Sequence, residues 1–208
     1  MHPEERIQTL LRCLASGYGD VRWWDAPPEE VMLGAVLTQQ TRWENVEDAL
    51  ARLREAGICT LEGIARSNPG VIQEAVRRTG FYRVKTRRLQ GLCTWALARG
   101  GIEGLSALPT PALRAELLKV RGVGEETADS ILCYAFFRPS FVIDAYTRRI
   151  CGCVGVTGSY ADLKALFERV LSRDARAYGQ AHGWIVEYAK DLCAKKRCEE
   201  CRIRTLRV

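Results

Sequence analysis

The chain has 208 residues, of which 47% are hydrophobic and 27% are charged, and its net charge is +6. These values are typical of one large globular domain or of two small lobes with a shared core, and they exclude a wholly disordered chain. No apolar run approaches the roughly 20 residues that span a bilayer, and the acidic N-terminal segment is unlike the basic start of a signal peptide. We therefore expect a soluble, cytoplasmic protein without a membrane partner, and the basic charge is compatible with binding to nucleic acid.

Apolar residues recur at helical spacing along most of the chain, and signals for strands are weak. Short breaks rich in proline and glycine lie at residues 26–28, 67–70, 108–111 and 156–159. About ten helices joined by short turns predict an all-α fold. The clearest helices are expected over Pro28–Leu37, Glu44–Arg54, Lys85–Ala98, Glu125–Phe137, Tyr160–Leu171 and Arg176–Leu192.

Two glycines, Gly122 and Gly124, lie between a helix expected to end near Val120 and the acidic start of the next helix. Glycines allow positive φ and close backbone approach, and amide groups beside a helix N-terminus can bind a phosphate oxygen. Val123 is expected to pack inward and fix the turn. Taken alone, however, the two glycines are better explained as an ordinary turn with a glycine C-cap.

An aspartate, Asp144, follows the short apolar run Phe141–Ile143 and precedes an arginine-rich helix. Aspartate is common at the N-cap of a helix, where its side chain accepts a hydrogen bond from a backbone amide. A partly desolvated carboxylate in the same place could also catalyse a reaction on bound DNA. Capping and catalysis are compatible roles for this residue.

Together these features resemble the helix-hairpin-helix DNA glycosylases, the superfamily that includes endonuclease III and the mismatch adenine glycosylase. The resemblance is carried by the hairpin glycines followed by Thr127 and Ala128, and by Asp144 with the arginine-rich helix behind it. It extends over nearly the whole chain. The segment Val36–Thr41 resembles the one that carries a glutamine into the DNA stack, and His182 begins a match to the last helix of the family.

This resemblance implies an all-α fold of two helical lobes with a DNA-binding cleft between them. Residues 28–137 would form a central lobe that ends in the helix-hairpin-helix, with the hairpin at about 119–124. Residues 1–27 and 138–208 would form the second lobe, which ends in a cysteine-rich tail. The protein is expected to act as a monomer on double-stranded DNA that contains a damaged base.

The resemblance also implies roles for single residues. Gly122, Val123 and Gly124 would bind DNA through a phosphate. Gln40 would fill the space left by the flipped base, and Asp144 would drive cleavage of the glycosidic bond. Base flipping is required because the reacting sugar carbon cannot be reached in the base stack.

Glu126 indicates which kind of glycosylase this is. Bifunctional members of the family, which also cut the strand, carry a lysine two residues after the second glycine, and its amine forms a Schiff base. Here that position is Glu126, and a carboxylate cannot form an imine. Lys119 precedes the hairpin and is expected to contact solvent or phosphate. The sequence therefore predicts a monofunctional enzyme that leaves an abasic site.

The segment 122–135 is very similar to the 3-methyladenine DNA glycosylase III subgroup, in which aromatic rings line the base pocket. Trp24 (or Trp23) and Trp43 fall at the matching places, with Glu126 at the rim, although aromatic residues more often pack in cores. The chemistry suits an alkylated base. N3-methylated adenine is cationic, so it leaves without protonation, and indole is a favourable partner for a cation. A carboxylate can stabilise the oxocarbenium-like sugar and orient water.

The chain has nine cysteines and no secretory signal, which argues against a disulfide framework. Most, Cys153 included, lie in apolar stretches and are expected to be small buried residues. Cys193, Cys198 and Cys201 cluster in a basic tail, where many members of the family bind a [4Fe-4S] cluster. The place of their fourth cysteine is Arg207 here.

Several alternatives stay open. Because a [4Fe-4S] cluster needs four ligands, the tail could bind a cluster with another fourth group, bind zinc, or be a remnant that binds neither. Any metal would be structural, and the chemistry needs no cofactor. The other functions to consider are an endonuclease III-like lyase, a mismatch-specific glycosylase for adenine, thymine or uracil, a non-catalytic DNA-binding module, and a redox sensor. The missing lysine opposes the first, and Asp144 opposes the non-catalytic module.

Overall fold

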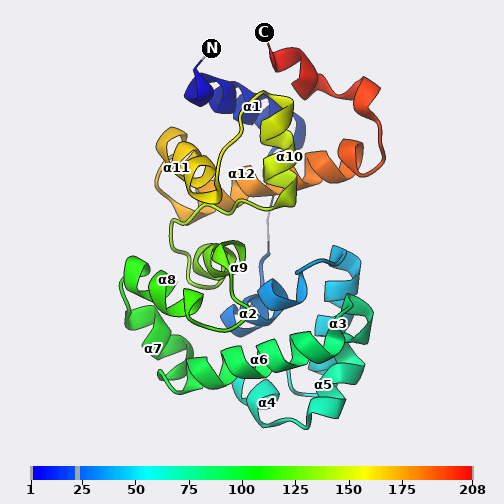
Figure 1. Cartoon of the computed structure of the whole chain (residues 1–208), viewed down its shortest axis with the longest axis vertical. Coiled ribbons are helices and arrows are strands. Elements are labelled where there is room, and N and C mark those ends of the chain that lie inside the picture. Colours follow the sequence, from blue (N-terminus) through cyan, green and yellow to red (C-terminus); the bar gives the residue numbers. More distant parts are fainter. Residues whose placement is uncertain (1, 22–23, 208) are drawn as a thin grey trace. The chain divides into compact units, whose positions relative to one another are not determined.

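The structure is a computed structural model that describes residues 2–21 and 24–207, without the side chains of residues 205 and 207. Every regular element in these ranges is a helix, which confirms the predicted all-α fold (Figure 1). The chain forms two compact units, one of Met1–Asp25 with Phe137–Val208 and the other of Ala26–Phe136. Within the described ranges, none of the helices is both long enough and apolar enough to cross a membrane.

The unit Ala26–Phe136 is built around one buried helix, α2 (Pro28–Leu37). Every residue of α2 from Val31 to Leu37 is buried, because the helix is apolar on all sides and packs on α3, α6, α9 and η2. In Figure 1, α6 lies between α2 on one side and α4 and α5 on the other. The other helices of this unit are α3 (Trp43–Glu55), α4 (Leu61–Arg66), α5 (Pro69–Val76), η1 (Arg77–Thr79), α6 (Tyr82–Leu97), α7 (Gly101–Ala107), α8 (Thr110–Leu118), α9 (Glu125–Ser130) and η2 (Ile131–Ala135).

Helices α8 and α9 flank the hairpin, and a buried ion pair joins them. Arg114 on α8 donates from Nε to Asp129 Oδ1 at 2.8 Å and from Nη2 to Asp129 Oδ2 at 3.0 Å. The Asp129 side chain is 0% exposed, and Arg114 also reaches the exposed Glu125 at the start of α9. A bidentate arginine–carboxylate pair restricts both distance and orientation. This pair therefore fixes the geometry of the hairpin between the two helices.

The other unit contains α1 (Pro3–Tyr18), α10 (Ala145–Cys153), α11 (Tyr160–Val170) and α12 (Ala175–Tyr188), followed by η3 (Ala189–Cys193), η4 (Cys198–Glu200) and η5 (Arg202–Arg207). Helix α12 packs against α1 and α10, and α11 packs on α1. The last predicted helix, Arg176–Leu192, is α-helical only to Tyr188. Beyond this residue it continues as a π-helical turn, in which the amide of Ala194 donates to the carbonyl of Ala189 at 2.9 Å.

Candidate active site

Asp144 stands at the end of an extended segment that is held in the core of its unit. Phe141 is fully buried and stacks on Phe167 of α11, with ring centroids 4.2 Å apart. The amide of Phe141 donates to Glu168 Oε1 at 2.9 Å. Because these contacts fix the segment before Asp144, the aspartate enters α10 in one position, as the N-cap before Ala145.

The carboxylate of Asp144 has two close partners. Its Oδ1 accepts the backbone amide of Thr147 at 2.7 Å, which is the N-cap hydrogen bond of α10. Its Oδ2 lies 3.5 Å from Nε2 of His182 on α12. The side chain of Asp144 is 16% exposed and that of His182 is 6% exposed. The carboxylate is therefore largely desolvated but keeps an accessible edge.

Burial acts to raise the pKa of Asp144, but the charge of protonated His182 and the hydrogen bonds from His182 and Thr147 act in the opposite direction. The net effect is a pKa below the ordinary value for aspartate. Asp144 is therefore an anion throughout the neutral range. A depressed pKa also means that this carboxylate adds stability above its unfolded pKa, and that this contribution is lost as the pH falls through the folded value.

Replacing His182 by glutamine should move the acid limb of the activity profile to higher pH. Glutamine keeps a hydrogen-bond donor near Asp144 but removes the positive charge that lowers the pKa of the carboxylate, so Asp144 becomes protonated at a higher pH. Single-turnover assays between about pH 4.5 and pH 8 would show a fall on the acid side that the wild type lacks, because burial raises the pKa of the carboxylate once the charge of His182 no longer opposes it. Superimposable profiles would mean that His182 does not tune Asp144.

The hairpin has a geometry that requires glycine at its first position. Gly122 has φ +91°, and a Cβ there would come within 2.5 Å of the side chain of Arg88. Val123 is 6% exposed and packs inward as expected. Gly124 is exposed and forms the N-cap of α9. The backbone of the hairpin is thus both tightly held on one side and accessible at the start of α9.

Gln40 lies in the turn between α2 and α3, and its side chain is exposed. Its backbone has φ +55°, in the left-handed region that residues other than glycine rarely adopt. The side chain of the neighbouring Gln39 donates a hydrogen bond to the hairpin, with Nε2 2.9 Å from the carbonyl oxygen of Gly122. The structure therefore brings the glutamine turn and the hairpin together within one unit.

The model of the HhH-GPD superfamily of base excision DNA repair proteins matches residues 33–173, which include the glutamine turn, the hairpin and Asp144. The chain belongs to the HhH-GPD superfamily. It is a DNA glycosylase of base excision repair, and its recognition as a helix-hairpin-helix glycosylase is confirmed.

Individual relatives of this HhH-GPD glycosylase agree with the family assignment. A protein of Methanocaldococcus jannaschii named as a DNA repair glycosylase, MJ1434, is 39% identical over 96% of this chain and 94% of its own length. Endonuclease III of Thermotoga maritima is 28% identical over 86% of this chain and 82% of its own length. Among solved structures, the 3-methyladenine DNA glycosylase of H. pylori bound to 1,N6-ethenoadenine is 30% identical, with a TM-score of 0.80, and covers 92% of this chain and 98% of its own. An endonuclease III–DNA complex shares the fold, with a TM-score of 0.83 at 22% identity over 99% of this chain and 95% of its own.

The three residues predicted to form the base pocket occupy different settings in the glycosylase. Trp24 is half-buried with φ +53° and belongs to the unit that contains Met1–Asp25. Trp43 is half-buried at the start of α3, and Glu126 is exposed in the first turn of α9, both in the unit Ala26–Phe136. Trp23, the alternative to Trp24, lies outside the described residues. The pocket stays a prediction.

The three cysteines of the tail lie in different segments of the chain. Cys193 ends η3, the exposed Cys198 begins η4, and the buried Cys201 accepts a hydrogen bond from Tyr188 Oη at 3.5 Å. Across residues 2–21 and 24–207, no group of three or more histidine, cysteine or acidic side chains is arranged to hold a metal. A cluster or a zinc ion in this tail therefore stays a prediction.

One cysteine near the tail was expected to be an ordinary buried residue. Cys153, the last residue of α10, is only half-buried. Burial raises the pKa of the Cys193 thiol, and the nearby thiols of Cys153 and Cys201 raise it further. Sequence spacing could not indicate that Cys153 is near Cys193, because the two residues are brought together by the packing of separate elements.

An exposed aromatic residue, Phe81, is a candidate DNA contact that the sequence analysis did not single out. Its side chain is 66% exposed and its backbone has φ 46°, a strained conformation for an aromatic residue. It adjoins Tyr82, whose ring lies under the guanidinium groups of Arg77 at 5.1 Å and Arg83 at 5.8 Å. Exposed aromatic side chains in a positively charged setting are suited to stacking on nucleic-acid bases.

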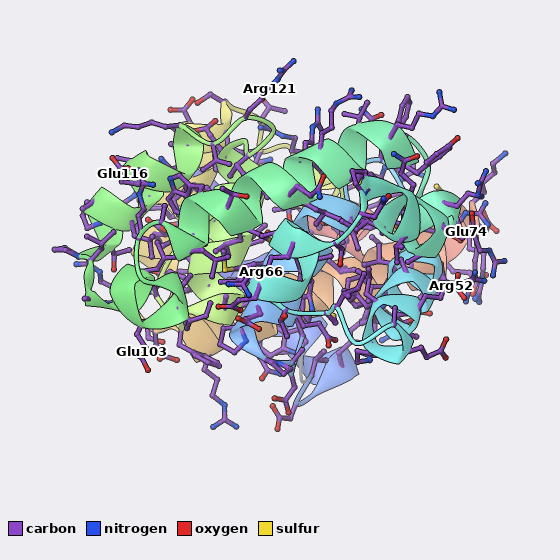
Figure 2. The ribbon with its side chains drawn as sticks, turned by 90° about the horizontal axis from the view of Figure 1, so that it is seen from below. Arg52, Arg66, Glu74, Glu103, Glu116 and Arg121 are labelled. Carbon is purple, nitrogen blue, oxygen red and sulfur yellow. The ribbon has the colours of Figure 1, made fainter. Side chains whose placement is uncertain are left out.

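Arg121 is the cation of the hairpin that carries no ion pair in the described part of the chain. Figure 2 shows the side chain of Arg121 extending away from the ribbon. By contrast, Lys119 is ion-paired with Glu116, and Glu116 also binds Arg99 at 2.8 Å. Arg121 is therefore better placed than Lys119 to contact a phosphate.

Proposed function

We propose that this glycosylase is monofunctional and hydrolyses the glycosidic bond of an alkylated, 3-methyladenine-like base flipped out of duplex DNA. The observation that carries the proposal is the residue two positions after Gly124. It is Glu126, exposed in the first turn of α9, where bifunctional members of the family carry the lysine that forms a Schiff base. Without that amine, the reaction would end with the release of the base and an intact abasic strand.

The setting of Asp144 supports hydrolysis of a base that is already a good leaving group. An alkylated cationic base needs no proton from the enzyme, and the electrostatic setting of Asp144 keeps it ionised rather than able to donate one. The anion would stabilise the positive charge that develops on the sugar, while its accessible edge orients a water molecule for attack. His182 and Thr147 would hold the carboxylate in place during this step.

The likeness to a solved alkylbase glycosylase also supports the choice of substrate. The H. pylori protein that was solved with 1,N6-ethenoadenine is a 3-methyladenine glycosylase, and it shares 30% of its residues with this chain over 98% of its own length. Helix α9 begins with the two carboxylates of Glu125 and Glu126. We infer that the same class of electron-poor base is the substrate here, read by the predicted pocket of Trp24, Trp43 and Glu126.

The DNA-contacting surface in this proposal comprises the hairpin, the glutamine turn and the aromatic residue that follows Gly80. Gly122 and Gly124 would approach a phosphate, with Val123 fixing the turn between them. Gln40 would enter the space left by the flipped base. We add Phe81 to these family-based roles, because a large exposed aromatic side chain can insert between bases that the flipped nucleotide has left unstacked.

Base release from methylated duplex DNA tests the proposed function, with hot alkali added to half of each reaction. We expect free 3-methyladenine, with strand breaks only after alkali. Strand breaks without alkali would show that another amine replaces the missing lysine, and the enzyme would then be a lyase of the endonuclease III type. Release of mismatched adenine, thymine or uracil, but not of alkylated bases, would overturn the substrate class and keep the reaction.

Replacing Phe81 by alanine should weaken binding to DNA without unfolding the protein. Stacking of one base on an aromatic side chain contributes about 1–3 kcal/mol, so the dissociation constant should rise by about tenfold. Since the side chain is 66% exposed, the free energy of unfolding should change by less than about 0.5 kcal/mol. Fluorescence anisotropy with abasic-site duplex DNA measures the affinity. Val71→Ala is a matched control, because Val71 is 50% exposed in α5 of the same unit; equal affinities of the two variants would exclude stacking by Phe81.

A further inference from the structure

The side chain of Gln39 joins the glutamine turn to the hairpin through three hydrogen bonds. Its Nε2 donates to the carbonyl of Gly122 at 2.9 Å and to Oγ1 of Thr127 at 3.0 Å. Its Oε1 accepts a hydrogen bond from Nη1 of Arg88 on α6. Gln39 is half-buried, and it lies directly before Gln40 in the chain. Three elements distant in sequence therefore meet at one amide group.

The chemistry of this junction requires an amide at position 39. Arg88 can only donate hydrogen bonds and the Gly122 carbonyl can only accept them, so a side chain between them must present one oxygen and one N–H group. Glutamate at this position would keep the bond to Arg88 but set a carboxylate oxygen against the Gly122 carbonyl. Methionine has a similar shape but would make none of the three bonds.

Arg88 is held between the junction and the hairpin. A Cβ on Gly122 would lie 2.5–2.7 Å from Cδ, Nε and Cγ of Arg88, so the stem of the arginine lies directly against the hairpin backbone. The residue is half-buried, and in the part of the chain that the structure describes it forms no ion pair with a carboxylate. A cation that is not neutralised by the protein, next to a hairpin of the phosphate-binding type, is suited to a polyanionic partner.

A second buried contact fixes the other side of the glutamine turn. Lys85, one turn before Arg88 on α6, is 2% exposed and donates from Nζ to the carbonyl of Leu37 at 2.9 Å. The same Nζ donates to the carbonyl of Thr79 at 2.7 Å. Leu37 is the last residue of α2, so the chain is pinned just before the turn by Lys85 and within it by Gln39. Gln40, with its left-handed backbone, has little freedom to move independently of the hairpin.

We propose that Gln39 and Arg88 are positioning residues that couple the hairpin to Gln40, so that docking of the hairpin on the DNA backbone places Gln40 in the space of the flipped base. The proposal rests on the proposed function for its DNA substrate, and it adds two residues that do not themselves react. Their loss should impair the insertion of Gln40 more than it impairs binding to DNA as such. A misplacement of about 1 Å in such a system can lower the rate of the reaction by about a hundredfold.

The test uses the full chain and a duplex that contains a stable abasic-site analogue, with 2-aminopurine as the opposite base. Insertion of a side chain next to the probe changes its stacking and hence its fluorescence, and no bond is cleaved. The amplitude is measured at saturating protein, so that it is separate from affinity. The variants are Gln39→Glu, Gln39→Met and Arg88→Met, with Gln40→Ala as the reference for lost insertion. Arg87→Met is the matched control, because Arg87 is the exposed neighbour of Arg88 on α6.

We expect Arg87→Met to keep the wild-type amplitude and the other variants to approach Gln40→Ala, with base release from methylated DNA slowed by about ten- to a hundredfold. The double variant Gln39→Met/Arg88→Met should be no worse than the more affected single variant, as for residues that act as one unit. Wild-type amplitudes in both Gln39 variants would overturn the proposal. Should the Gln39 variants fail to fold, as judged by thermal unfolding, a wild-type amplitude in Arg88→Met would overturn it. Because the probe needs no catalysis, a wild type that releases no alkylated base would contradict only the proposed function.

Discussion

An Asp144→Asn protein should bind damaged duplex DNA but release bases about a hundred- to a thousandfold more slowly than the wild type, since removal of a group that stabilises charge in the transition state typically has an effect of this size. Asparagine has the same shape as aspartate and can still accept the amide of Thr147, so the N-cap of α10 is preserved. What is lost is the negative charge beside the sugar. Single-turnover release of 3-methyladenine from methylated DNA measures the effect, and anisotropy measures binding.

Asp174→Asn is the matched control for this experiment. Asp174 is the N-cap of α12, and its side chain accepts the amide of Ala177 at 2.9 Å, so the same substitution is made in the same structural role. Its activity should stay within about twofold of the wild type, and both variants should lose less than about 1 kcal/mol of stability. If Asp144→Asn retained the activity of Asp174→Asn, the catalytic role of Asp144 would be wrong and only its capping role would remain.

Arg114→Met should be the most destabilising of the substitutions considered. It leaves the fully buried carboxylate of Asp129 without its guanidinium partner, and breaking a buried ion pair in this way costs about 3–5 kcal/mol. Because Arg114 is 27% exposed, solvent should reduce the loss toward the lower end of that range. Urea denaturation followed by circular dichroism measures the change. Weaker binding to DNA should accompany it, because α8 and α9 hold the hairpin between them.

The exposed pair of Arg52 and Asp48 on α3 is the comparison for Arg114. These side chains are 43% and 31% exposed, one helical turn apart, with Nε and Oδ2 separated by 3.1 Å. Arg52→Met should cost less than about 0.5 kcal/mol, as exposed pairs on a helix do. An Arg114→Met variant as stable as Arg52→Met would show that Asp129 finds other partners and that the clamp does not hold the hairpin.

Features of the fold that are determined by neighbouring residues could be predicted from the sequence. Helix α2 has the predicted bounds, Pro28–Leu37, because proline and acidic residues mark its start and its apolar character requires burial. The turn between α8 and α9 was predicted from two glycines and an acidic first turn, and the family resemblance identified it as the hairpin. The start of α10 at Asp144 followed from a short apolar run that ends in an N-capping residue. Each of these signals lies within a few residues of the feature that it predicts.

The side-chain contacts that build the site and hold the hairpin could not be predicted in this way, because they join residues far apart in the chain. The pair of His182 and Asp144, the bond from Gln39 to Gly122 and the clamp of Arg114 on Asp129 join residues separated by 15 to 83 positions. No local spacing encodes such pairs. Phe81 was missed for a different reason, because an aromatic residue in a mixed segment predicts core packing, whereas here a left-handed backbone turns it outward. The end of the last long helix was overestimated, because its apolar periodicity continues through the π-helical turn.

The left-handed backbones of Gln40 and Phe81 have a consequence for how this surface can vary. At either position, glycine would relieve a conformational cost of about 1 kcal/mol, so selection for stability alone would favour its appearance there. Glycine would also remove the side chain, which is the part of the residue that can contact DNA. At these two exposed positions, the residue that would give the more stable fold therefore differs from the residue that repair requires. Variants with glycine at these sites should be more resistant to heat but poor at repair. A screen for heat resistance would select such variants, and a screen for survival of DNA damage would eliminate them.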